Sequence, residues 1–444
     1  MAAILSPLPK LNNIPFLTCL VGNNLEHLWD SIRRENPKLV WITDKEAESL
    51  RWHLMRSDGS FKFGTSVVLW YGLSREEAAS IITQFDDSHL GPTKSVQSNV
   101  AQRTGVRSYS TAASPQLRVG LIGARGHTGQ ELVQLINSHP NMRLTHISSR
   151  ELSGKILESY TKEQIRYELI PADVIGQIDD VDAWILALPN GVAKTYVDAL
   201  DKKPGPVILD LSADYRFDDS GRWWYGLPEL YPFSGKASAG NPAVTRISNP
   251  GCYATGCQVG LKPLIDATVG KGLQLPGRPT IFGVSGFSGA GTTSSPKNDP
   301  EVLRDNMIPY SLTGHIHERE AGRHLKTPVY FSPHVASFFR GITLTISVPL
   351  PAGVDFTSQS LLDLYSSTYS QHGLIDVQEE VPLVKDNQNH HGVRVGGFTM
   401  AKDGSRAVLV ATLDNLLKGA ATQAIQNLNL AFGLPGHTGI PPFK

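Results

Sequence analysis

The stretch Leu117–Pro140, LRVGLIGARGHTGQELVQLINSHP, decides how the rest of the chain is interpreted. Its apolar start is typical of a buried strand, glycines follow, and apolar residues then recur at helical spacing. A strand, a glycine-rich turn and a helix form the dinucleotide-binding unit of a Rossmann fold, because glycines admit the pyrophosphate and helix N–H groups bind it. The spacing is GxxGxxG rather than GxGxxG, so a glycine turn in an unrelated α/β unit is the alternative. The expected cofactor contacts are Gly123, Arg125, Gly126, His127, Thr128 and Gly129.

The residues at the end of the next expected strand, Leu144–Ser148, indicate which dinucleotide binds. NAD enzymes usually place an acidic residue there to bind the ribose 2′-hydroxyl. Here Ser148, Ser149 and Arg150 stand at the strand end, and a guanidinium can bind a 2′-phosphate through two hydrogen bonds. We therefore predict NADP as the cofactor, while Glu151 keeps NAD as an alternative.

Two further apolar runs, at 183–188 and 206–211, are typical of parallel strands that are buried on both faces. Ligands of such sheets bind at the carboxyl ends of the strands. Pro189, Asn190 and Ser212 follow these runs and are candidate cofactor contacts, although ordinary turns between strand and helix explain the same residues.

The segment Ser248–Cys257, SNPGCYATGC, places a cysteine directly after a Pro-Gly turn and at the start of an expected helix. Unpaired N–H groups and the helix dipole at such a position favour the thiolate, which is the nucleophilic form. We predict Cys252 as a catalytic nucleophile that faces the cofactor cleft. Cys257 lies within the expected helix and is predicted to be a core residue.

A loop of small residues follows the expected strand Thr280–Val284. Exposed N–H groups in such a loop can hold an anion. Ser285, Gly286 and Gly289 are therefore further candidate cofactor contacts.

A histidine cluster, His315-Ile-His-Glu-Arg-Glu320, comes next. On a helix, His317 and Glu320 share one face, and a histidine beside an orienting carboxylate is typical of general acid–base catalysis. We predict His317, or else His315, as the acid–base and Glu320 as its orienting carboxylate. A metal site lacks further ligands, so no metal is expected, and a solvated helix face is the alternative without a function.

Alternating strands at Ile342–Val348 and Arg406–Leu413 indicate an α+β second domain with antiparallel strands. His334 and Arg340 are candidate ligands of a substrate carboxylate, or else partners in internal salt bridges. The last expected helix, 415–432, has the apolar spacing to return to the first domain, and Asn415 at its start is a candidate cofactor contact.

Residues 1–93 differ in character and predict a small α+β extension. A helix is expected at Leu25–Glu35, strands at Leu39–Thr43 and Ser66–Tyr71, and a capped helix from Ser74 to Phe85. Residues 94–116 lack acidic side chains and predict a linker or a processing segment, in which Arg107–Ala112 is similar to a mitochondrial processing site.

Composition limits the class of partner. The chain has 444 residues with 41 basic and 41 acidic side chains, so no broad field attracts nucleic acid or an anionic membrane. No apolar run is long enough to span a bilayer. Three cysteines are too few for a disulfide framework or a zinc site, and a small-molecule substrate is expected.

From about Leu117 to the C-terminus, the motifs together resemble the N-acetyl-γ-glutamyl-phosphate reductase family of the semialdehyde dehydrogenase group; they include GARGHTG, SSR, ALPNG, DLSADYRF, NPGCYAT, SGFSGAG and HIHEREAGRHL. The resemblance implies an NADP domain at 117–251 and 414–444, and a catalytic and oligomerisation domain at 252–413. It implies a homo-oligomer, either dimer or tetramer. Three positions depart from the family pattern, namely His127, Thr292 and the pair Glu318-Arg319.

The same resemblance implies a reaction. NADPH would reduce N-acetylglutamyl phosphate to N-acetylglutamate 5-semialdehyde through a thioester on Cys252, as a step of arginine biosynthesis. The stretch 52–72 resembles the end of the acetyltransferase-like domain that follows acetylglutamate kinase in fungal polyproteins. This second resemblance implies a mitochondrial location and an association with that kinase.

Other classes of function stay open at this stage. A related semialdehyde dehydrogenase would act on another acyl phosphate, such as aspartyl phosphate. A cysteine hydrolase or acyltransferase would use Cys252 and His317 without a nucleotide. A non-catalytic subunit would bind NADP and dock on the kinase through residues 1–90.

Overall fold

The computed structural model describes residues 116–202, 205–233, 235 and 242–443, and the backbone of four strands before residue 72. The chain divides into two compact units, Met1–Ser108 and Tyr109–Lys444. The described part of the first unit is an antiparallel sheet in the order β1-β2-β4-β3, with β1 (Ala2–Leu5), β2 (Leu17–Gly22), β3 (Leu39–Thr43) and β4 (Ser66–Tyr71). The two strands expected in this unit are confirmed. Its expected helices, and the processing segment up to residue 115, lie outside the described residues.

The second unit begins with a parallel sheet of seven strands in the order β10-β11-β9-β8-β5-β6-β7. The strands are β5 (Leu117–Ile122), β6 (Met142–Ser148), β7 (Tyr167–Glu168), β8 (Ala183–Leu186), β9 (Val207–Asp210), β10 (Trp224–Tyr225) and β11 (Arg246–Ser248). The four residues of β8 and of β9 are all buried, as expected of strands covered on both faces.

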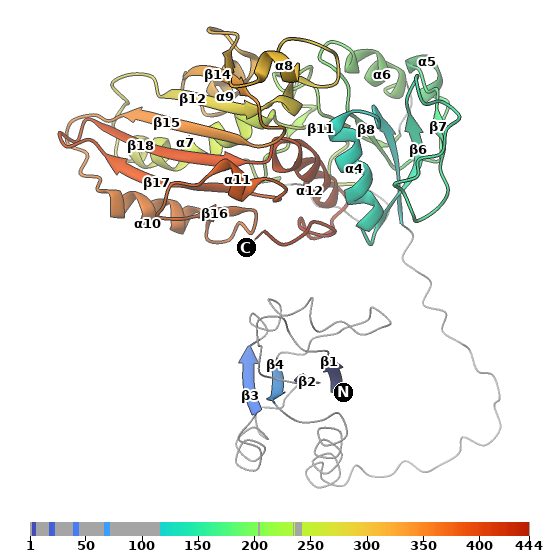
Figure 1. Cartoon of the computed structure of the whole chain (residues 1–444), viewed down its shortest axis with the longest axis horizontal. Coiled ribbons are helices and arrows are strands. Elements are labelled where there is room, and N and C mark those ends of the chain that lie inside the picture. The colour runs from blue at the N-terminus through green and yellow to red at the C-terminus, as the bar shows by residue number, and fades with distance from the viewer. Residues whose placement is uncertain are drawn as a thin grey trace. The chain divides into compact units, whose positions relative to one another are not determined.

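Helices cover both faces of this parallel sheet. Apolar residues of α4 (His127–Ser138) and α12 (Thr422–Ala431) form one core with the sheet, and those of α5 (Ala172–Ile175) and α6 (Ala193–Leu200) form another around Trp184. Figure 1 shows α12, from the C-terminal end of the chain, beside α4. The predicted Rossmann-type fold and the return of the last helix are both confirmed, although that helix is preceded by a separate π-helical turn, η3 (Leu417–Ala421).

The second sheet also has seven strands, in the order β13-β14-β12-β15-β18-β17-β16. They are β12 (Thr280–Gly286), β13 (Met307–Pro309), β14 (Tyr330–Ala336), β15 (Ile342–Pro349), β16 (Ile375–Val377), β17 (Val393–Met400) and β18 (Arg406–Leu413). The sheet is mixed rather than purely antiparallel as expected, because β12 pairs with β14 and β16 with β17 in parallel. The chain between β12 and β14 crosses over through a helix, which is how parallel neighbours are connected.

Helix α7 (Cys252–Gly270) lies against this second sheet, behind β15 and β18 in Figure 1. Its glycines allow a close approach, since a Cβ on Gly256 would lie 2.5 Å from Leu344. Cys257 is 1% exposed in this core, so its predicted role is confirmed. The remaining helical elements are η2 (Phe287–Ala290), α8 (Pro300–Leu303), α9 (Ile316–His324), α10 (Ser358–Tyr369) and α11 (Val384–Asn387). Within the described ranges, none of the helices has the length and apolar character needed to cross a bilayer.

Candidate active site

The glycine-rich turn between β5 and α4 is shaped by backbone contacts. Gly123 has a φ of +91°, and a Cβ there would lie 2.2 Å from the carbonyl oxygen of Ala187. A Cβ on Gly129 would lie 2.3 Å from the Gly123 oxygen. No side chain caps the start of α4 after Gly126, so its first N–H groups stay available to an anion. These residues fit a dinucleotide pyrophosphate.

The groups expected to choose between NADP and NAD lie at the end of β6. Arg125 forms a 2.8 Å ion pair with Glu151, so the carboxylate that favoured NAD is engaged by a cation. The hydroxyls of Ser148 and Ser149 accept hydrogen bonds from the Ile170 and Leu152 N–H groups, both at 3.3 Å. Arg150 is exposed beside them.

Side-chain hydrogen bonds stabilise the turns that follow β8 and β9. Asn190 Oδ1 accepts a hydrogen bond from the Ala213 N–H at 2.9 Å, and the Ser212 hydroxyl donates to Asp210 at 2.7 Å. Pro189 directly precedes the first of these turns. Both polar side chains therefore have the turn-building role that was the alternative to cofactor binding.

The turn before Cys252 is held by a buried carboxylate. Glu320, on α9 and 0% exposed, accepts hydrogen bonds from the Gly251 N–H at 2.8 Å, the Tyr225 hydroxyl at 2.8 Å and the Arg216 guanidinium at 3.0 Å. Arg216 Nε also donates to the carbonyl oxygen of Asn249 at 2.8 Å. The sequence singled out Glu320, which the structure places at this turn, but not Arg216, although the motif DLSADYRF contains it.

The expected hydrogen bond between Glu320 and His317 is not formed. Although the two residues are three positions apart on α9, the carboxylate reaches the neighbouring domain instead. Its role is to fix the backbone at Gly251 rather than to orient the imidazole.

His317 lies against the same turn. A Cβ on Gly251 would stand 2.2 Å from His317 Nε2, whereas His317 Nδ1 is buried and has no hydrogen-bond partner in the described structure. His315 caps α9, because its Nδ1 accepts a hydrogen bond from the His317 N–H at 3.1 Å. This geometry favours His317 over His315 as the group beside the cysteine.

The protonation state of Cys252 differs from the one expected from the sequence. Burial raises the pKa of Cys252 to about 11, which outweighs the lowering effect of the Tyr253 N–H and of Arg216. The predicted bias toward thiolate is therefore wrong for this structure. The pKa of His317 is held well below its ordinary value by burial, and then by Arg216 and His315. A neutral imidazole beside a neutral thiol can accept the thiol proton as the sulfur attacks.

The loop after β12 is paired rather than open to an anion. The N–H groups of Gly286, Phe287 and Ser288 donate to carbonyl oxygens of residues 338–341. Asn415 donates to the Ser288 hydroxyl at 2.9 Å and accepts from the Gly341 N–H at 2.7 Å. The anion contact predicted through the N–H groups of this loop is therefore wrong for Gly286, and Asn415 is a structural cross-link. Ser285 and Gly289 lie against each other beside it.

Arg340 joins the second domain to helix α4 of the nucleotide-binding domain. Its guanidinium pairs with Glu131 on α4, with Asn389, and with Asp414 at 3.2 Å. The predicted role in binding a substrate carboxylate is not supported, because the group is engaged by internal partners, which was the alternative. His334 Nδ1 donates a hydrogen bond to the Ser332 carbonyl oxygen at 3.1 Å, and its ring packs on Phe282.

Comparison with known proteins agrees with this architecture. Residues 118–237 match the model of the semialdehyde dehydrogenase NAD binding domain, and residues 252–415 match that of the semialdehyde dehydrogenase dimerisation domain. The chain is 49% identical over 319 residues to an N-acetyl-gamma-glutamyl-phosphate reductase of Xanthomonas axonopodis pv. citri, covering 71% of this chain and 95% of the relative. This chain belongs to the N-acetyl-γ-glutamyl-phosphate reductase family.

A second relative is longer than this chain. The chain is 42% identical over 461 residues to Protein ARG5,6, mitochondrial, of Candida albicans, covering 98% of this chain and 52% of the relative. It thus spans about half the length of that curated relative. Residues 2–88 match a model of the N-acetyltransferase of N-acetylglutamate synthase. The fold is shared with an aspartate semialdehyde dehydrogenase of Candida albicans solved with NADP, at 17% identity and a TM-score of 0.53, over 71% of this chain and 99% of that chain.

Two of the departures from the reductase pattern have a structural account. The His127 ring meets Phe339 edge-on at 5.2 Å, so it forms part of the contact between the nucleotide turn and the second domain. Glu318 accepts a hydrogen bond from the Phe331 N–H at 2.9 Å, which ties α9 to β14. Thr292 is exposed.

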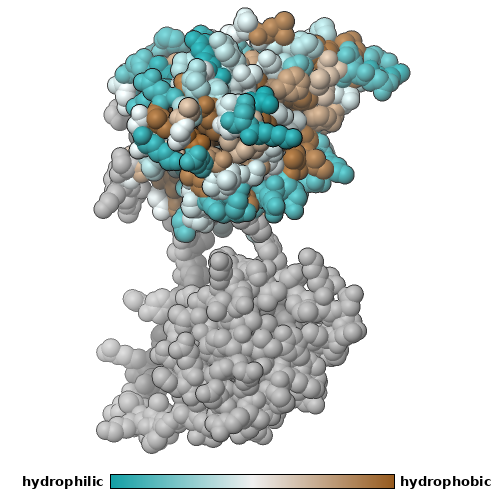
Figure 2. All heavy atoms as spheres, turned by 90° about the vertical axis from the view of Figure 1, so that its left-hand side faces the viewer, coloured by the Kyte–Doolittle hydropathy of each residue, from teal (hydrophilic) through white to brown (hydrophobic). Residues whose placement is uncertain are grey.

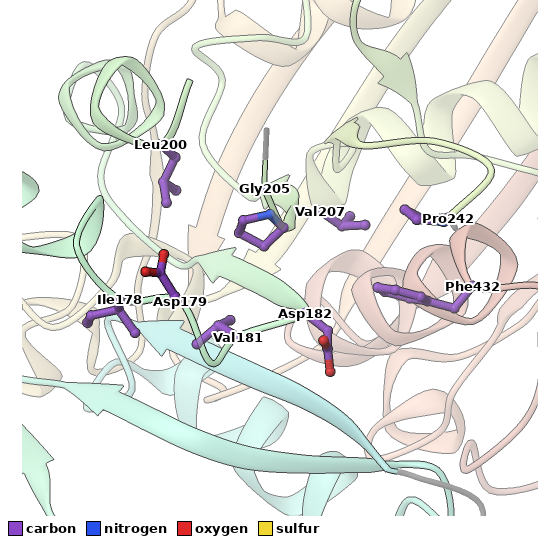
Figure 3. Close-up of a pocket in the computed structure, with 10 residues that line it drawn as sticks. Ile178, Asp179, Val181, Asp182, Leu200, Gly205, Val207, Pro242 and Phe432 are labelled. Atoms are coloured by element: carbon purple, nitrogen blue, oxygen red, sulfur yellow. The ribbon is translucent and has the colours of Figure 1, made fainter. Parts of the chain in front are cut away.

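A cavity of about 220 Å³ lies elsewhere, at the amino ends of β8 and β9. Figure 3 shows its lining, which includes Val181 and Val207 at the strand starts and Phe432 after α12. Because ligands of parallel sheets bind at the carboxyl ends of the strands, this cavity is not the cofactor site of the reductase fold.

Proposed function

We propose that this chain catalyses the NADPH-dependent reduction of N-acetyl-L-glutamyl 5-phosphate to N-acetyl-L-glutamate 5-semialdehyde and phosphate. The observation that carries the proposal is that Cys252, at the first turn of α7, and a neutral His317 both lie at the Gly251 turn. This pair directly follows a nucleotide-binding unit. The 49% identity to a protein named for this reaction supports the choice of substrate.

NADP fits the residues of the first domain. The glycine cradle at 123–129 would hold the pyrophosphate at the start of α4, and Arg125 and Arg150 would face a 2′-phosphate. A structural neighbour was solved with NADP, which supports this cofactor. When bound, the nicotinamide supplies the hydride for the reduction.

The chemistry of the chain's own residues follows from the site. Sγ of Cys252 attacks the γ-acyl carbon while His317 accepts the thiol proton, and the C–O bond to phosphate breaks as a thioester forms. N–H groups at the start of α7 stabilise the oxyanion, and Glu320 fixes the turn that aims them. When the sulfur is later released, His317 returns a proton to it.

A reverse assay tests the proposal. Wild-type protein is expected to reduce NADP with N-acetylglutamate semialdehyde only when phosphate is present, and Cys252→Ser to lose at least about a thousandfold of that rate. Cys257→Ala, in the core of the same helix, is the control and is expected to retain activity. Equal rates for wild type and Cys252→Ser would remove Cys252 from the mechanism. Activity with aspartate semialdehyde alone, or none at all, would favour another substrate, a hydrolase or a non-catalytic NADP-binding subunit.

We also infer a homo-oligomer. On the face of the second sheet away from α7, Phe282 is 43% and Tyr330 53% exposed, whereas their neighbours Ile281 and Phe331 are buried. Figure 2 shows the end of this unit that lies on the left in Figure 1, where apolar atoms lie among polar ones. A second copy would cover such a face, and the match to a dimerisation domain supports it. A monomeric mass in light scattering would contradict it.

A mitochondrial location and an association with acetylglutamate kinase complete the proposal. The name of the Candida albicans relative supports the location, and the acetyltransferase match of residues 2–88 supports a link to the earlier steps of arginine synthesis. Cell fractionation and co-purification with the kinase test these two points.

A further inference from the structure

Lys297 lies on a loop that the sequence did not mark as part of the site. The loop, residues 291–298, connects η2 with α8, and Asn298 holds it in one shape. The Asn298 side chain donates to the carbonyl oxygens of Gly291 at 3.0 Å and Thr293 at 2.8 Å, and accepts from the Ser295 N–H at 2.8 Å. Four residues of the loop are thus tied together, so that Lys297 projects from an ordered loop.

Lys297 is half-buried, and its ammonium group has no acidic partner among the described residues. It stands 4.8 Å from the centre of the Tyr310 ring, a cation–π contact that leaves N–H donors available for an anion. The other cation of the site, Arg216, is paired with Glu320 at 3.0 Å. Lys297 therefore contributes a positive charge that the described residues do not neutralise locally.

This charge is connected to the reacting groups by a row of ring contacts. The Tyr310 ring packs on His315 at 5.6 Å, and His315 packs on His317 at 4.9 Å. Lys297 adds to the burial that lowers the pKa of His315 to about 4, and Cys252 in its thiolate form adds to the burial that raises the pKa of Tyr310. Lys297, Tyr310, His315 and His317 thus form a continuous row that ends beside the Cys252 turn.

We propose that Lys297 binds the phosphate of the acyl phosphate substrate, and inorganic phosphate in the reverse reaction. The inference rests on the proposed function and assigns a further substrate-binding residue to it. A dianion gains most from an ammonium group that lacks another charged partner. The phosphate is attached to the carbon that Cys252 attacks, whereas three carbons separate that carbon from the carboxylate of a glutamyl substrate. A cation joined to the histidines by one aromatic ring is therefore placed for the phosphate.

Steady-state kinetics of the reverse reaction test this assignment, with inorganic phosphate, N-acetylglutamate semialdehyde and NADP varied in turn. Lys297→Met is expected to raise the KM for phosphate by about tenfold or more, with the KM values of the other two substrates within about twofold of wild type. Lys297→Arg is expected to recover most of the phosphate affinity. The matched control is Lys271→Met, because Lys271 also lies 4.8 Å from an aromatic ring, that of Phe356, at the far end of α7.

The outcomes separate the two proposals. No phosphate-dependent activity in the wild type would overturn the proposed function itself. An active wild type and an unchanged phosphate KM in Lys297→Met would overturn the role of Lys297. A rise in the KM for the semialdehyde alone would also overturn it, since Lys297 would then bind the carboxylate. Thermal melts show whether Lys297→Met is folded, and Lys297→Arg keeps the test open if it is not.

Discussion

The nucleotide turn and the cysteine turn both contain glycine and both precede a helix, yet they are built in different ways. The turn at 123–129 is fixed by contacts of the backbone with itself and with the adjacent strand end at Ala187. The turn before Cys252 is fixed by side chains from distant segments, with Glu320 at the centre of three hydrogen bonds. We therefore expect the nucleotide turn to be disrupted by substitutions that add side-chain atoms, and the cysteine turn to be disrupted by substitutions that remove a charge.

The largest expected effect tests the cysteine turn. Glu320→Gln removes the charge that neutralises the buried Arg216, and it turns an amide N–H₂ toward groups that are themselves donors. Breaking a buried ion pair in this way costs about 3–5 kcal/mol. We therefore expect urea unfolding to show a loss of this size, together with a large fall in kcat.

The matched control is Asp219→Asn. Asp219 pairs with Arg323, on the same helix as Glu320, but its side chain is 86% exposed. Exposed pairs contribute about 0–1 kcal/mol. If Glu320→Gln is no more destabilising than this control, side-chain contacts do not hold the cysteine turn.

The second effect tests the nucleotide turn. In Gly129→Ala the new Cβ would stand 2.3 Å from the Gly123 oxygen and 2.8 Å from the Ala124 backbone, neither of which can move freely. Overpacking of this kind costs about 1–3 kcal/mol. We expect a lower free energy of unfolding and weaker NADPH binding, measured by urea titration and by cofactor fluorescence.

Gly322→Ala on α9 is the control with the opposite sign. A Cβ there meets its nearest neighbour, Pro328, at 3.5 Å, which is ordinary contact. Since alanine is favoured over glycine inside a helix, we expect a gain of up to about 1 kcal/mol. Equal changes in the two variants would show that the nucleotide turn is not closely packed.

The difference between local and long-range contacts also explains which features could be predicted from the sequence. The strand, glycines and helix of the nucleotide unit lie within 24 consecutive residues, and their pattern was enough to place the turn. The start of α7 at Cys252 is equally local and was also predicted.

Long-range partners could not be predicted in this way. Helical spacing predicted that His317 and Glu320 lie on related faces of one helix, but it could not predict which domain packs against that helix. In the structure, Glu320 accepts hydrogen bonds from Gly251 and Arg216 of the other domain. The N–H groups of the loop after β12 looked free because their partners, residues 338–341, are brought to them by sheet pairing. The pKa of Cys252 depends on burial, which a helix start does not reveal.

The smallest expected effect concerns cofactor choice at the nucleotide turn. Glu151 is the carboxylate that left NAD as an alternative cofactor. Glu151 and its partner Arg125 are both well exposed, so Glu151→Gln should change the stability by less than about 1 kcal/mol. Removal of the negative charge releases Arg125 and lessens repulsion of a 2′-phosphate, which should tighten NADPH binding by about threefold at low salt.

NADH binding should stay the same, and Glu158→Gln, which changes another exposed glutamate of this domain, should alter the affinity for neither cofactor. If Glu151 instead holds a ribose 2′-hydroxyl, its loss weakens NADH and leaves NADPH unchanged. Fluorescence titrations of the two cofactors separate these outcomes, because only a carboxylate that contacts the ribose can lower the affinity for the cofactor without the phosphate.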